Sequence, residues 1–171
     1  MAADGSAAVL WPRYGAHGRR TLEVSVAPPG GRFGRPQALV SVVANLIGNQ
    51  VFASGGRFAA VWWQGVPGHD HAIRYAVSTG TRFGAFQTLT PVNGNGSVSS
   101  AADPSGNVLA SWGDTKGQAA AAVLAPGADR FGPAQVVSAD TARTGSFAYP
   151  NAFAGPGVAT RNCHGNSPLT T

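Results

Sequence analysis

The densest group of chemically reactive side chains in this sequence lies in one polar segment, GVPGHDHA. His69, Asp70 and His71 are consecutive there, and neutral imidazoles and carboxylates are common metal ligands. If the segment is extended, alternation places His69 and His71 on the same side. The spacing identifies no third protein ligand, and polar loops rich in His and Asp are usually solvated. We therefore assign no metal site and expect no cofactor.

Trp63 stands a few residues before this segment, where the corresponding positions hold Pro12 and Gly113. Adjacent strand residues face opposite ways, so if Trp62 packs inward, Trp63 points outward and can stack on a sugar or a partner side chain. The alternative, which we favour, is that Trp63 packs between two sheets. With Arg74 completing the group, the candidate ligand-binding residues are Trp63, His69, Asp70, His71 and Arg74.

The acidic residues and the cysteine do not form a recognisable catalytic set. Glycoside hydrolysis requires two carboxylates at a controlled separation, but Glu23 is the single Glu of the chain and alternates outward on a strand. Asp4 and Asp103 lie in turns, where Asp usually bonds its own backbone. Cys163 is the single cysteine, which excludes an internal disulfide framework. No catalytic residue is assigned.

These candidates are positioned by a sequence repeat of about 50 residues, a period typical of β-propeller blades. One marker of the repeat is a tryptophan, found at Trp11, Trp62 and Trp112. The other is an Arg-Phe-Gly triplet followed by a glutamine, with its aromatic ring at Phe33, Phe83 and Phe131 and its amide at Gln37, Gln87 and Gln135. We expect the three Phe rings to be wedged at equivalent positions, either between blades or at blade ends.

Short apolar runs between turns predict antiparallel strands. The expected strands are 7–11, 21–28, 36–41, 49–54, 58–63, 72–79, 86–91, 97–103, 108–112, 118–125 and 134–138, with two more at 148–155 and 157–162. The alanine-rich run 118–125 has helical propensity, but its counterparts in the other repeats alternate as strands. The repeats span about 3–41, 49–91 and 97–138, with a partial repeat at 148–162 and a tail at 163–171. Residues 1–162 are thus expected to form one array.

The composition supports an all-β chain. Hydrophobic residues make up 43% of it and charged residues 11%, and 24 Gly and 12 Pro are placed singly between apolar runs as turn residues. The net charge of +5 comes from dispersed arginines, so we expect no nucleic-acid partner. Residues 1–10 lack a signal-peptide pattern, and no run approaches the roughly 20 apolar residues of a membrane span.

The pattern Asp103-x-x-Gly106-Asn107, then Trp112, then Arg130-Phe131-Gly132-x-x-Gln135 resembles tandem β-propeller repeats of exported bacterial proteins, distantly similar to sialidase-type propellers. The resemblance implies an all-β array of four-stranded antiparallel blades. The first repeat brings strands two to four and the last brings strands one and two, so joining them would duplicate a strand, and we expect about three blades cut from a longer propeller. The resemblance also implies an extracellular or cell-surface location.

The function predicted from the repeat and its loops is a non-catalytic binding or scaffold module that recognises a glycan or a protein through its inter-strand loops. The alternative is part of a sialidase-like glycoside hydrolase or lyase whose catalytic residues lie partly outside this segment. Unpaired blade edges would favour self-association.

Overall fold

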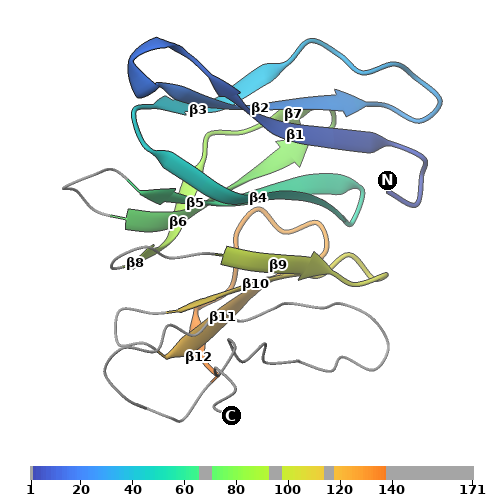
Figure 1. Cartoon of the computed structure of the whole chain (residues 1–171). Helices are drawn as coiled ribbons and strands as arrows, with labels where there is room; N and C mark the ends of the chain where they lie inside the picture. The colour runs from blue at the N-terminus through green and yellow to red at the C-terminus, as the bar shows by residue number, and fades with distance from the viewer. Residues whose placement is uncertain (1, 66–70, 93–97, 114–117, 138–171) are drawn as a thin grey trace, which may run out of the picture.

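A computed structural model describes residues 2–65, 71–92, 98–113 and 118–137, and within these ranges the chain is all-β, with one short 3₁₀ turn, η1 (Ala16–Gly18). Three antiparallel sheets are stacked one after another in chain order (Figure 1). We call them the first, second and third sheets. No helix in the described part of the chain is long and apolar enough to cross a membrane.

The first sheet contains three strands, β1 (Ala7–Tyr14), β2 (Arg20–Ala27) and β3 (Gln37–Val42), in the order β1-β2-β3. Alternation in β2 directs Leu22, Val24 and Val26 toward the second sheet, where all three are buried. Polar residues occupy the other face of β2, and Ser25 is satisfied there by donating to the Gly34 carbonyl at 2.7 Å. One edge of β1 is paired with β2, and its other edge is the edge of the sheet.

The second sheet is a meander of β4 (Asn45–Ser54), β5 (Arg57–Gly65) and β6 (His71–Thr79), with β8 (Gln87–Val92) and the short β7 (Arg82–Phe83) both paired to β6. Residues 58–65 of β5 are all buried. A neighbouring sheet covers each face of this strand, so its sequence from Phe58 to Trp63 is continuously apolar rather than alternating. Gly55 and Gly56, both at positive φ, form the β4–β5 turn as expected for a hairpin.

The third sheet contains β9 (Val98–Ala102), β10 (Val108–Gly113), β11 (Ala119–Leu124) and β12 (Gln135–Val136), in the order β12-β11-β10-β9. The alanine-rich run is a strand, as the repeat predicted. Ala120 lies opposite Trp112 in the β10–β11 register, so a small side chain stands beside the large indole. The strands expected at 148–155 and 157–162 lie outside the described residues.

Two apolar layers hold the stack together. Trp62, Phe58 and Phe83 pack with Leu22 and Val24 between the first and second sheets. Trp63, Ile73 and Tyr75 pack with Trp112 between the second and third sheets, and Phe131 joins this layer from the edge. The repeated Trp and Phe therefore point toward the preceding sheet in the second and third repeats.

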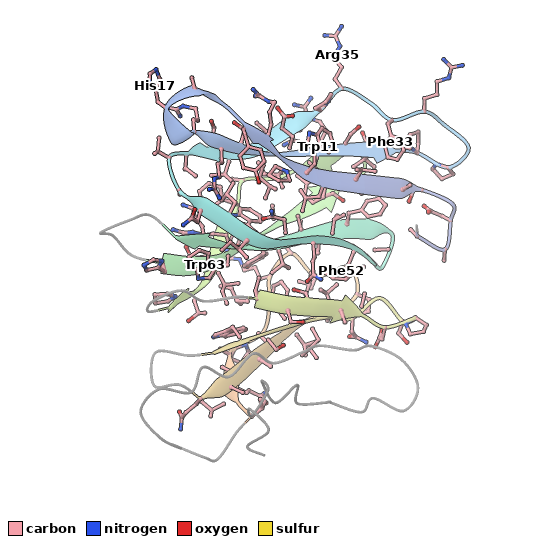
Figure 2. All side chains as sticks on the ribbon, in the orientation of Figure 1. Trp11, His17, Phe33, Arg35, Phe52 and Trp63 are labelled. Carbon is pink, nitrogen blue, oxygen red and sulfur yellow. The ribbon has the colours of Figure 1, made fainter. Side chains whose placement is uncertain are left out.

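The expectation that the three repeated Phe rings are wedged at equivalent positions, between blades or at blade ends, is wrong for Phe33. Phe83 is 5% exposed and Phe131 is partly buried, but Phe33 is 51% exposed. The turns themselves are alike, because the glycine after each Phe donates to a strand carbonyl in every repeat: Gly34 to Val26, Gly84 to Val77 and Gly132 to Val123. Phe33 is exposed because no described sheet precedes the first one (Figure 2).

The repeated glutamine joins consecutive sheets. Gln37 donates from Nε2 to the Phe83 carbonyl at 2.7 Å and accepts the Phe83 N–H at 2.9 Å. Gln87 accepts the Tyr75 hydroxyl at 2.9 Å and donates to the Asp129 carbonyl at 3.4 Å, two residues before Phe131. Gln37 thus satisfies the backbone of Phe83 in the next Arg-Phe-Gly turn, whereas Gln87 bonds the carbonyl that immediately precedes that turn in the third repeat.

Candidate binding site

The predicted ligand-binding residues do not form one site. His69 and Asp70 lie outside the described residues, while Trp63, His71 and Arg74 are described. His71 faces the third sheet with Trp63, whereas Arg74 faces the first sheet beside Trp62. Alternation along β6 thus separates His71 from Arg74.

The outward-pointing alternative for Trp63 is corrected by its burial. Its indole is 1% exposed and lies between the second and third sheets, so it cannot present a face to a sugar. Its ring stacks on His71 at a centroid distance of 5.2 Å. Gly65, opposite His71 in register, allows this stack, because a Cβ there would lie 2.5 Å from His71 Nδ1. Trp63 is therefore an inter-sheet contact.

Arg74 is held in a local cluster with two neighbours. Its guanidinium lies over the Phe86 ring, 5.5 Å from the centroid, and its Nη1 donates to the Thr88 hydroxyl. Phe86 in turn makes an edge contact with Trp62. Through these contacts the Arg74 side chain packs on the second sheet.

Glu23, the carboxylate considered for hydrolysis, forms an ion pair with Arg13 at 2.8 Å on the outer face of the first sheet. Among the described residues, no group of three His, Cys, Asp or Glu side chains is arranged to hold a metal ion. A concave surface is the other feature of the described part that can bind a ligand.

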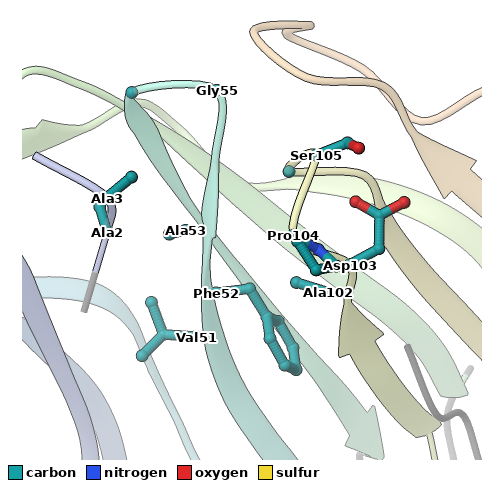
Figure 3. A pocket seen from close by; sticks show the side chains of 12 residues that line it. Ala2, Ala3, Val51, Phe52, Ala53, Gly55, Ala102, Asp103, Pro104 and Ser105 are labelled. Carbon is teal, nitrogen blue, oxygen red and sulfur yellow. The ribbon is translucent and has the colours of Figure 1, made fainter. Parts of the chain in front are cut away.

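A pocket of about 660 Å³ opens where turns of all three sheets meet (Figure 3). That volume is within the roughly 300–1,000 Å³ usual for ligand sites. The half-buried residues Val51, Phe52 and Ala53 of β4 line it, with Val51 and Ala53 on the side of the first sheet and Phe52 on the side of the third. The Asp103–Gly106 turn forms its polar wall. The remaining lining residues are Ala2, Ala3, Gly55, Gly56 and Ala102.

The polar wall is built by side-chain bonds that follow from the Asp103-x-x-x-Asn107 spacing. Asp103 Oδ1 accepts the Asn107 N–H at 2.9 Å, and Oδ2 accepts the Asn107 side-chain amide at 2.8 Å. The Asn107 side chain thereby holds the pKa of Asp103 below its ordinary value. Because a carboxylate has about four acceptor sites, the anion retains capacity for donors from a ligand.

The turns around the pocket are locked together by close backbone approaches. Ser54 donates to the Gly106 carbonyl at 2.8 Å in a buried bond. Gly106 has φ +88°, and a Cβ there would lie 2.7 Å from the Gly55 nitrogen. A Cβ on Gly55 would in turn lie 2.5 Å from the Gly127 nitrogen. The pocket wall is therefore formed before any ligand arrives.

The first repeat has a similar turn outside the pocket lining. Asp4 Oδ1 accepts both the N–H and the hydroxyl of Ser6, at 2.8 and 2.7 Å, and these bonds lower the pKa of Asp4. The sequence expectation that both aspartates bond their own turns is confirmed. What the sequence did not indicate is that only Asp103 would border a pocket with Phe52, a residue that the repeat markers do not single out.

No protein-family model matches this sequence, and no curated protein matches it.

Proposed function

We propose that this chain is a non-catalytic binding module that recognises a glycan in the pocket between Phe52 and Asp103. The observation that carries the proposal is the juxtaposition of an apolar wall with an ionised, partly exposed carboxylate in one preformed cavity. A sugar ring has an apolar C–H face and a rim of hydroxyl donors. Such a ligand can place its C–H face against Phe52 while a hydroxyl donates to Asp103.

The framework proposed for this module is a β-propeller of four-stranded blades. The support is that each sheet is an antiparallel meander of consecutive strands, and that Trp62 and Trp112 make equivalent contacts to the preceding sheet. Gln37 and Gln87 also each bond a backbone carbonyl of the next repeat, that of Phe83 and that of Asp129, at or just before the Arg-Phe-Gly turn. The first sheet is then a blade with three of its strands in place. A module of this kind suits an extracellular or cell-surface protein.

The test is a glycan array followed by titration calorimetry on the best hits. Asp103→Asn removes the charge, and Ser105→Trp fills the pocket mouth from an exposed position. Asp103→Asn is expected to weaken binding about tenfold, because it removes the charge that strengthens the hydrogen bond from the ligand. Ser105→Trp is expected to weaken binding at least as much, because the indole occupies the space of the ligand. Asp4→Asn is the matched control, because this turn aspartate does not line the pocket.

Retained affinity in both pocket variants would place recognition elsewhere on the molecule. An array on which the intact protein binds no glycan would overturn the ligand class. Circular dichroism of each variant checks that the fold is unchanged.

A further inference from the structure

The first sheet presents, uncovered, the residue types that the other two sheets bury against a neighbour. Trp62 and Phe83 pack on the first sheet, and Trp112 and Phe131 pack on the second. On the first sheet, Ala8 and Leu10 of β1 face the second sheet, so alternation directs Val9 and Trp11 to the opposite face. Val9 is 46% exposed there.

The loop after β2 completes this outer face. Phe33 is half-exposed, and its turn has the same Gly34-to-Val26 bond that its buried counterparts have. Its backbone N–H and C=O have no hydrogen-bond partner among the described residues, although the equivalent groups of Phe83 are both bonded by Gln37. The outer face thus lacks the glutamine that the repeat supplies elsewhere.

The third sheet presents the complementary surface. Gln135 lies opposite Ala121 in register, as Gln37 lies opposite Val24 and Gln87 opposite Tyr75. Gln135 is exposed, and its side chain makes no hydrogen bond to a described residue. Val123, on the same face of β11 as Ala121, is 47% exposed. Among the residues between 2 and 137 that the structure describes, this face of the third sheet therefore has the glutamine but no Arg-Phe-Gly turn for it to bind.

We propose that a second copy of this chain docks head to tail on the outer face of the first sheet. In this contact the third sheet of one copy covers Trp11 and Phe33 of the next copy, and the Gln135 side chain bonds the Phe33 backbone N–H and C=O. The contact continues the interface that the chain already forms twice within itself, between the first and second sheets and between the second and third sheets. A repeat whose faces are complementary in this way stacks on its like.

The number of copies follows from closure, which rests on the propeller framework proposed above. A head-to-tail contact either closes into a ring or extends into a filament. Propellers typically contain about 4–8 blades. Counting only the three sheets of the described residues, two copies fall within that range and three copies exceed it. The assembly expected is a dimer.

The first measurement is the mass of the intact chain by sedimentation velocity across a concentration series. We expect twice the monomer mass of 17.3 kDa at high concentration. Trp11→Arg and Gln135→Ala should each weaken the dimer about tenfold or more. Val43→Ser is the matched control, because Val43 is 54% exposed in the β3–β4 connection, away from both faces.

The second measurement determines the geometry, with Cys163 replaced by Ser in every protein. Phe33→Cys and Gln135→Cys chains are prepared separately and treated with a short bis-maleimide, alone and mixed. A cross-linked dimer in the mixture, with much less in either protein alone, supports the head-to-tail contact. Efficient cross-linking of Phe33→Cys with itself would show a face-to-face pair and overturn the proposal. So would a chain that stays monomeric at every concentration.

A larger head-to-tail oligomer that still cross-links only in the mixture would keep the contact and refute closure at two copies. Neither experiment depends on a glycan, so failure of the docking proposal is distinct from failure of the proposed binding function.

Discussion

Replacing Gln37 by Ala removes the side chain that joins the first two sheets at their Arg-Phe-Gly turn. The variant leaves the N–H and C=O of Phe83 without the partners found at 2.9 and 2.7 Å. Leaving a buried polar group unsatisfied costs about 1–3 kcal/mol. Both bonds are only partly buried, so water can replace some of the lost interaction, and the lower end of that range applies to each group.

The expected loss is consequently about 2 kcal/mol of unfolding free energy, from two groups at about 1 kcal/mol each. With a urea dependence of roughly 2 kcal/mol per molar, this lowers the unfolding midpoint by about 1 M. Gln37→Glu distinguishes the bond to the Phe83 N–H from the bond to the Phe83 carbonyl. The carboxylate still accepts the Phe83 N–H, but it faces the Phe83 carbonyl without a proton to donate, so at neutral pH it should be at least as destabilising as Ala.

The assay is urea unfolding followed by tryptophan fluorescence, at a protein concentration where the chain is monomeric. Gln135→Ala is the matched control, because Gln135 is the same repeat position but is exposed. It should change stability by less than about 0.5 kcal/mol. Equal midpoints for Gln37→Ala and Gln135→Ala would refute the claim that the glutamine joins the sheets.

Two further predictions concern burial and pH. Phe83→Ala should cost about 3–5 kcal/mol, whereas Phe33→Ala in the monomer should cost under about 1 kcal/mol, because the rings are 5% and 51% exposed; similar unfolding midpoints would contradict this difference. The pKa of Asp103 is lowered in the folded chain, chiefly by the Asn107 side-chain bond, from the ordinary 3.8. Its stabilising effect is therefore present above about pH 4 and is lost as the pH falls through the folded pKa. Asp103→Asn should reduce the acid-induced loss of stability in thermal melts between neutral pH and about pH 3, and an unchanged pH profile would show that the bond does not stabilise the turn.

The repeat allowed the strands and their faces to be predicted, because Trp, Phe and Gln recur at fixed positions. The burial of an individual residue within the pattern could not be predicted in the same way. Phe33 and Phe83 have the same local sequence, yet one is exposed and the other buried, because burial depends on the presence of a preceding sheet. Local patterns define an interface surface but do not show whether it is occupied.

The candidate ligand group shows a second limit of sequence reasoning. Proximity along the chain suggested that His71 and Arg74 act together, but three residues along a strand place two side chains on opposite faces. The pocket, in contrast, combines Phe52 of β4 with Asp103 of a turn about 50 residues further along the chain. Only the stacking of the sheets brings these two residues together, and no short sequence motif predicts that proximity.

The unpaired edge of β1 has a practical consequence for anything attached ahead of residue 2. β5 and β10, its counterparts, are each flanked by strands on both sides, while β2 is the one described strand that pairs with β1. Its outer backbone groups are a template for an added strand. We expect a fusion tag with alternating β-branched residues to pair with this edge and add a fourth strand to the first sheet. A tag that is rich in Gly, Ser and Pro would leave the edge open, so the sequence of the tag determines whether the first sheet has three strands or four.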